Sequence, residues 1–168
     1  MFSLLQKTIS HIKTKTHKQT TMIKRILNWF RNKKCNEISF MQAFELTELP
    51  VITFYQNGNK YNLLLDTGSS ANVIDKNVLK NLEHTMYEGT GNLTGMDGIL
   101  HTVKACDIAF NYKNVTYNYQ YLIKDLKATF DYIKKETGVT LHGIIGTKFF
   151  AEYKYILDFD KLIAYSKA

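Results

Sequence analysis

A carboxylate, a hydroxyl, a glycine and a second hydroxyl follow one another at Asp66, Thr67, Gly68 and Ser69. The three residues before them, 63–65, are leucines, so the carboxylate comes at the end of a run that predicts a buried strand. A carboxylate that loses water in this way must be heavily hydrogen-bonded or change its pKa, and both are common at reactive sites. Taken alone, these residues predict a reactive carboxylate and an ordinary Asx turn equally well.

A predicted β-hairpin positions Asp66. Residues 51–55 and 61–65 are rich in β-branched, aromatic and leucine side chains, and Asn57-Gly58 lies between them. Asn-Gly between two such runs is a strong signal for a tight hairpin turn. The second strand of this hairpin therefore ends at Asp66.

A glycine-rich stretch follows, with Gly89, Gly91, Gly95 and Gly98 within ten positions. It predicts either a mobile hairpin that covers a site or a long exposed turn. It lacks the strand-to-helix context and the Lys-Ser/Thr ending of a phosphate-binding loop.

The rest of the chain predicts a mainly β domain with little helix. Ile144 and Ile145 stand between Gly143 and Gly146, a pattern typical of a place where another backbone comes very close. The other predicted elements are a second hairpin (103–110 and 115–123), a loop with at most one helical turn (124–139), a short helix (147–153) and a closing hairpin (155–165).

The positive charge is concentrated at the N-terminal end. Nine of the 22 Lys and Arg residues and no Asp or Glu occur through Lys34, whereas residues 35–168 carry 13 basic and 15 acidic side chains, a net charge of −2. We therefore divide the chain into a basic arm, 1–44, and a folded domain, 45–168. The nearly neutral domain predicts no broad nucleic-acid interface.

Ile23, Ile26, Leu27 and Phe30 recur at helical spacing, so residues 22–33 predict a short basic amphipathic helix. Such a helix is typical of peripheral contact with a membrane or an acidic partner, and also of a solvated helix that packs loosely on its domain. The arm has no apolar stretch long enough for a membrane span or a secretory signal. We expect a cytoplasmic protein, with membrane association through the arm left open.

The sequence predicts no metal site and no cofactor. Cys35 and Cys106 lie far apart, and neither has a Cys or His at metal-ligand spacing. The five histidines are scattered along the chain, and we expect them to be ordinary surface or core residues.

The turn at Asp66-Thr67-Gly68, together with Gly143-Ile144-Ile145-Gly146 and the short helix after it, resembles the single-lobed, retropepsin-like aspartic proteases. The resemblance spans residues 49–165, and the hairpins and the glycine-rich stretch come in the family's order. It implies a closed β-barrel, half of an acid-protease fold, with one or two short helices. It also implies an endopeptidase that uses an activated water and needs no cofactor.

By this resemblance Asp66 is catalytic, with Thr67 and Gly68 supporting it. Hydrolysis by this route needs one carboxylate as base and a second as acid, and the chain has one Asp-Thr-Gly, so the resemblance implies a homodimer whose two carboxylates share a proton. Thr67 would brace the pair across the dimer, and Ser69 would lie near the outer oxygen of Asp66. Activity would favour mildly acidic to near-neutral pH. The residues expected to bind a polypeptide substrate are Ser69, the flap residues Gly95, Met96, Asp97 and Gly98, and Ile144 and Ile145.

The sequence departs from the retroviral members at two places. Ser69 replaces the usual Ala, and Thr147-Lys148 stands where those proteins have an Arg that supports the dimer through an ion pair. A catalytically silent module that dimerises or binds peptides, tethered by its basic arm, is therefore the alternative to the protease.

Overall fold

The structure is a computed structural model that describes residues 38–94 and 98–166. The predicted amphipathic helix at 22–33 and the middle of the glycine-rich stretch, 95–97, lie outside the described residues.

The mainly β fold expected from the sequence is confirmed. The strands are β1 (Val51–Gln56), β2 (Asn59–Leu65), β3 (Val73–Asp75), β4 (Thr85–Thr94), β5 (Leu100–Tyr112), β6 (Val115–Lys124), β7 (Gly143–Ile145), β8 (Tyr155–Asp158) and β9 (Ile163–Ser166). The helices are α2 (Phe40–Thr47), the 3₁₀ helix η1 (Leu79–Asn81), α3 (Lys127–Thr137) and α4 (Thr147–Glu152).

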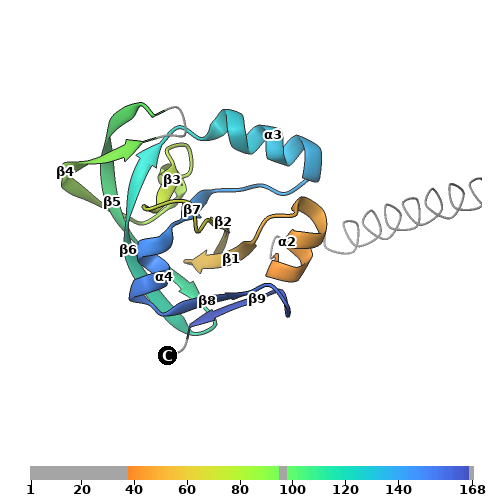
Figure 1. Ribbon diagram of the computed structural model, residues 1–168. Coiled ribbons are helices and arrows are strands. Elements are labelled where there is room, and N and C mark those ends of the chain that lie inside the picture. The colour runs from red at the N-terminus through yellow and green to blue at the C-terminus, as the bar shows by residue number, and fades with distance from the viewer. Residues whose placement is uncertain (1–37, 95–97, 167–168) are drawn as a thin grey trace, which may run out of the picture. The chain divides into compact units, whose positions relative to one another are not determined.

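The main sheet closes into a barrel, as Figure 1 shows. Its strand order is β1-β2-β7-β3-β6-β5-β4, and a further pairing between Tyr55 of β1 and Asn111 of β5 joins its two sides. Strand β4 extends beyond this closure as the outer strand of the β4–β5 hairpin. β8 and β9 form a separate two-stranded sheet.

The predicted hairpins are confirmed, and left-handed residues make their turns. Asn57 and Gly58 have φ values of 50° and 74° between β1 and β2. Lys113 and Asn114 have φ values of 47° and 66° between β5 and β6. Two successive residues with positive φ give the turn whose twist matches that of the flanking strands.

Two helices correct the sequence analysis. The domain was expected to begin at residue 45, but α2 begins at Phe40, and the side chains of Phe40 and Ala43 are buried. Ser39 caps this helix in a reciprocal capping box with Gln42. Residues 40–44 therefore belong to the folded domain and not to the arm.

The second correction is α3, in the segment expected to be a loop. Phe130 is the one residue of this 11-residue helix that is fully buried, and Ile133 packs beside it. The helix ends at Gly138, whose φ is 77° and whose N–H donates to Lys134 O. So narrow an apolar stripe gives almost no periodic signal in the sequence.

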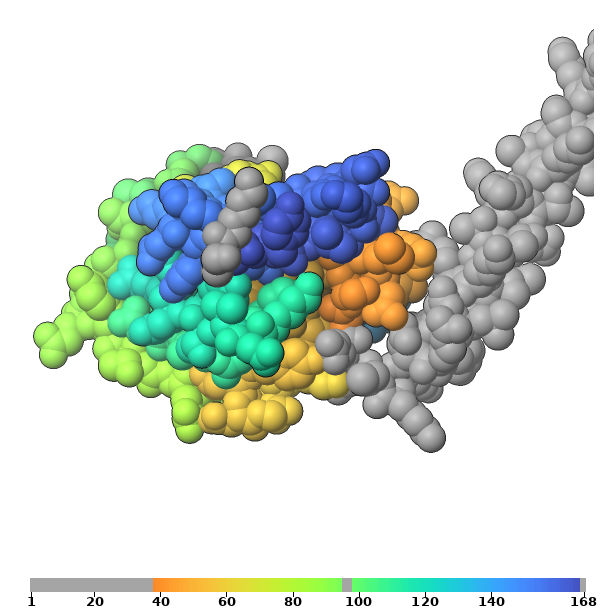
Figure 2. Space-filling model, turned by 90° about the horizontal axis from the view of Figure 1, so that it is seen from below, coloured from red at the N-terminus to blue at the C-terminus, as the bar shows by residue number. Residues whose placement is uncertain are grey.

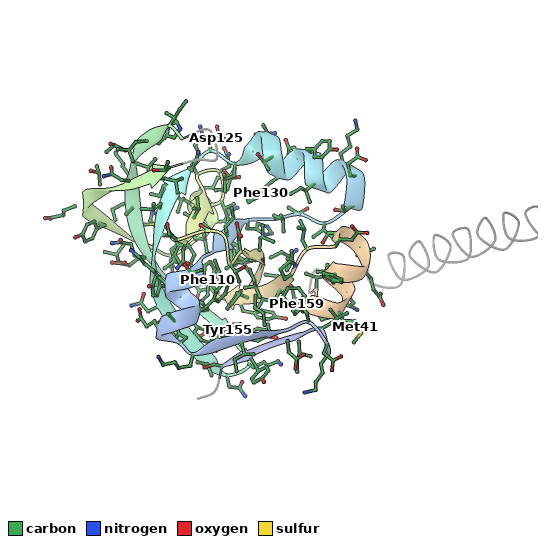
Figure 3. All side chains as sticks on the ribbon, viewed as in Figure 1. Met41, Phe110, Asp125, Phe130, Tyr155 and Phe159 are labelled. Atoms are coloured by element: carbon green, nitrogen blue, oxygen red, sulfur yellow. The ribbon has the colours of Figure 1, made fainter. Side chains whose placement is uncertain are left out.

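The core consists of two clusters. The larger fills the barrel and extends under α4, β8 and β9, and Phe110 and Tyr155 belong to it. The smaller lies under α2 and α3 and includes Phe130. Figure 3 labels these three side chains.

The β8–β9 hairpin lies beside α2 (Figure 2). The ring centroid of Phe159, in the β8–β9 turn, is 5.3 Å from that of Phe40 and 6.1 Å from that of Phe44, both edge-to-face. The C-terminal hairpin is thereby held to the start of the domain.

Among the described helices, none is long and apolar enough to cross a membrane.

Candidate active site

Asp66 is the first residue after β2, and its main chain extends the pairing of β2 with β7. Leu64 and Leu65 pair in parallel with Ile144 and Ile145, and the N–H of Asp66 then donates to Ile145 O at 2.9 Å. The side chain of Asp66 is half-buried. A carboxylate therefore stands at the end of a buried strand, as the sequence predicted, and the structure adds the parallel pairing of that strand with β7.

The turn after Asp66 orients this carboxylate. The N–H of Gly68 donates to Asp66 Oδ1 at 2.8 Å, and the N–H of Ser69 donates to Asp66 O at 3.2 Å. A Cβ at position 68 would lie 3.2 Å from Asp66 Oδ1, so a glycine suits the close approach of its own amide to the carboxylate. An amide donor to an ionised oxygen forms a charge-assisted hydrogen bond.

The predicted partners of Asp66 differ in their placement. Thr67 and Gly68 are exposed, so the outer face of the turn is open in the single chain. Ser69 was expected beside the outer oxygen of Asp66, but its hydroxyl donates to Ala71 O at 2.7 Å. The hydroxyl proton of Ser69 is thus used in a local turn and is not donated to the carboxylate, and the placement of Ser69 beside the outer oxygen of Asp66 stays a prediction.

The glycines at 143 and 146 are required by close backbone contacts. A Cβ at Gly146 would lie 2.6 Å from Ala71 O and 2.7 Å from Ser69 O, and one at Gly143 would lie 2.6 Å from Val73 O. Real Cβ atoms essentially never come this close to backbone atoms. The inference from sequence that another backbone passes these glycines is confirmed: the loop that begins at Asp66 passes Gly146, and the first residue of β3 passes Gly143.

Two polar residues tie this loop to β7 and α4. The side chain of Asn72 is buried, and its Oδ1 accepts the N–H of Gly146 at 2.8 Å. Thr147 donates its N–H and its hydroxyl to Ser69 O at 2.8 and 3.1 Å. Sequence reasoning missed Asn72; a polar residue directly before the apolar pair 73–74 was the available signal.

The two isoleucines expected to bind substrate both serve the core. Ile145 is fully buried in the larger cluster, so the expectation that its side chain contacts substrate is corrected. Ile144 is half-buried and packs against the smaller cluster, the one under α2 and α3. Alternation along β7 sends these neighbouring side chains to opposite sides of the strand.

The glycine-rich stretch forms the antiparallel hairpin of β4 and β5. A Cβ at Gly91 would lie 2.3 Å from Leu122 Cδ2, and Leu122 pairs with Val73 just after the Asp66 loop. The hairpin therefore lies against the strand next to the candidate site. Gly98 is exposed, with φ +72°. The expected flap residues Gly95, Met96 and Asp97 lie outside the described residues.

Other reactive side chains of the described part give no competing site. Cys106 is buried in the core, and burial, with a smaller effect of Asp107, raises its pKa to about 11. Within 38–94 and 98–166, no three His, Cys, Asp or Glu side chains gather as metal ligands would.

Comparison with known proteins gives similarities among solved structures. No family model and no curated protein matches the chain. Among solved structures, the retroviral protease-like domain of Ddi1 from Leishmania major is similar with a TM-score of 0.47 and 9% sequence identity, over 71% of this chain and 87% of that one. A similarity of this size does not identify an activity.

Proposed function

We propose that the chain is an aspartic endopeptidase that acts as a homodimer. The observation that carries the proposal is the carboxylate of Asp66 at the end of β2. The Gly68 amide orients it, the main chain of Asp66 is bonded to β7, and Asn72 ties the loop after Asp66 to Gly146. The chain has one Asp-Thr-Gly, and Thr67 and Gly68 are exposed beside it. A second copy would supply the second carboxylate through a two-fold axis.

The reaction needs the two carboxyl groups in different protonation states. The ionised one takes a proton from water while the water oxygen bonds to the peptide carbonyl carbon, and the protonated one gives its proton to the carbonyl oxygen. The tetrahedral intermediate then collapses: the C–N bond breaks, one carboxyl group gives its proton to the leaving nitrogen, and the other carboxylate takes a hydroxyl proton from the intermediate, which restores the shared proton of the dyad. An extended peptide would lie under the β4–β5 hairpin, which would act as a flap and add main-chain hydrogen bonds.

Asp66→Asn tests the catalytic role. The new side chain keeps an oxygen that can accept the Gly68 N–H, so we expect the fold and the unfolding midpoint to change little. Cleavage of a peptide library between about pH 4 and 7 should fall by at least about a hundredfold, since general acid–base catalysis contributes about 10²–10⁴. Asp131→Asn, at an exposed carboxylate on α3, is the matched control and should retain full activity.

Mixing tests the dimer. When equal amounts of wild-type and Asp66→Asn protein exchange subunits, only about a quarter of the dimers keep two wild-type chains, and the rate should fall to about half that of the wild type alone. An unchanged rate after exchange would show that one chain suffices. A wild-type protein that cleaves nothing while it dimerises would favour the catalytically silent module.

A further inference from the structure

His142, directly before β7, makes two hydrogen bonds to one residue of β2. Its N–H donates to Asn62 O at 2.9 Å, and the N–H of Asn62 donates to the ring nitrogen Nδ1 of His142 at 2.9 Å. A backbone N–H can only donate, so Nδ1 accepts through its lone pair and carries no proton. The two strands are therefore joined just before their first ladder pair, Leu63 with Gly143.

The other polar atoms of Asn62 each have a partner of their own. Its side chain is buried, Nδ2 donates to Thr140 O at 2.9 Å, and Oδ1 accepts from Thr53 Oγ1 at 2.7 Å. Its main-chain oxygen already accepts from His142. If His142 Nδ1 no longer accepts, the main-chain N–H of Asn62 is left buried without an acceptor, which costs about 1–3 kcal/mol.

The surroundings of the ring favour its neutral form. The ring packs edge-to-face on Tyr61 with the centroids 5.6 Å apart. Burial has the largest effect on the pKa of His142 and lowers it, a hydrogen bond with the Asn62 backbone raises it, and the positive charge of Lys134 on α3 lowers it further. The negative charge of Asp75 on β3 opposes this, and the N–H of Asp75 also donates to His142 O at 3.0 Å.

We propose that His142 is a positioning residue for Asp66 that acts only while its ring is neutral, so that acid loosens the β2–β7 pair that carries the carboxylate. Protonation at Nδ1 sets two N–H groups against each other and breaks the hydrogen bond from the Asn62 N–H to the ring, in β2 and four residues before Asp66. This rests on the proposed function only in treating the Asp66 turn as an active site. The effect on the strands is independent of any activity.

The sign of the pH effect follows from the lowered pKa. The unfolded chain binds a proton at this histidine near its ordinary value of about 6.5, whereas the folded chain resists protonation until lower pH. The neutral ring's contribution to stability is therefore complete above about pH 6.5 and is lost as the pH falls through the lower folded value. In an aspartic protease with this arrangement, the histidine and not the catalytic carboxylates would set the lowest pH at which the enzyme is active.

His142→Asn on the full-length chain tests this. The asparagine oxygen can stand where Nδ1 accepts but does not titrate, and His84→Asn, at an exposed histidine, is the matched control. We expect the urea midpoint of the wild type and of His84→Asn to fall between about pH 7.5 and about pH 5, and that of His142→Asn to fall clearly less. An equal fall in all three proteins would overturn the proposal. The comparison uses the change with pH, because the smaller side chain costs stability at every pH.

Nuclear magnetic resonance of the wild type gives a readout that needs neither the variant nor activity. The ring Nδ1 should be unprotonated at neutral pH, and the protection of the Asn62 amide, corrected for its intrinsic exchange rate, should fall roughly tenfold as the ring titrates, as expected for one lost hydrogen bond. A protonated Nδ1 at neutral pH, or steady protection of Asn62 through the titration, would refute the role. If the wild type also cleaves peptides, the acid limb of its rate should move to lower pH in His142→Asn.

Discussion

Gly146→Ala should strongly destabilise the domain through steric conflict alone. Gly146 has φ −101° and ψ −179°, an extended conformation open to alanine, so the substitution adds no backbone strain. The added Cβ would lie 2.6 Å from Ala71 O and 2.7 Å from Ser69 O, and neither atom belongs to a side chain that could rotate away. Relief requires β7 to move away from the Asp66 loop.

The structure sets the size of the effect. Overpacking of this kind costs about 1–3 kcal/mol. Moving the strand also stretches the bond from Gly146 N to Asn72 Oδ1 and the two bonds from Thr147 to Ser69 O, each worth about 1 kcal/mol. We therefore expect a loss of about 4–6 kcal/mol if all three bonds break, a large part of the roughly 5–15 kcal/mol that stabilises a typical domain.

Urea unfolding measures this loss, and Gly58→Ala is the control. Gly58 has φ +74°, and no atom lies within 4 Å of the place that an added Cβ would take, so that substitution brings only backbone strain, about 1 kcal/mol. If Gly146→Ala lowered the unfolding midpoint no more than Gly58→Ala, the close passage of the loop past β7 would be wrong. An unchanged urea midpoint with shifted nuclear magnetic resonance signals of the Asp66 and Thr147 amides would instead mean that the loop moves aside without a loss of stability.

Two further substitutions test the supports of the site and the core. Asn72→Ala should cost about 1–3 kcal/mol in urea unfolding, because it leaves the buried N–H of Gly146 without its acceptor; a change below about 0.5 kcal/mol would contradict this. Tyr155→Phe should leave stability unchanged or raise it by up to about 1 kcal/mol, since its buried hydroxyl has no hydrogen-bond partner among the described residues; a clear loss would show that the hydroxyl is bonded after all.

The hairpins could be predicted because their signals are local. Asn57-Gly58 specifies a turn by the conformations of two residues, and the apolar runs on either side specify the strands. Helix α2 had a local signal too, the capping box of Ser39 and Gln42, which the interpretation of this segment as part of an arm overlooked. Helix α3 had a weaker signal, because its one buried residue, Phe130, does not form a repeating apolar pattern at helical spacing.

The candidate site could be predicted only in outline. Asp66 and Gly146 were recognisable because a carboxylate at a strand end and a glycine beside apolar residues are each unusual. Asn72 and His142 were not, because their roles depend on which backbone groups lie beside them after strands distant in sequence have paired. The residue type alone does not indicate which distant backbone group an asparagine or histidine side chain will bond.

The same dependence on distant strands explains why stability and any activity should change together. The local bonds to Asp66 come from the turn that follows it, through the N–H groups of Gly68 and Ser69. Behind it, the main-chain bond to Ile145 O, the contact past Gly146 and the join at His142 all come from the last third of the chain. A chain that has formed its first hairpin but not yet docked β7 would therefore carry an Asp66 that is solvated and free to rotate. The proposed catalytic activity of Asp66 would therefore require the completed barrel. Conditions that loosen β7 should abolish this activity before the hairpins themselves unfold.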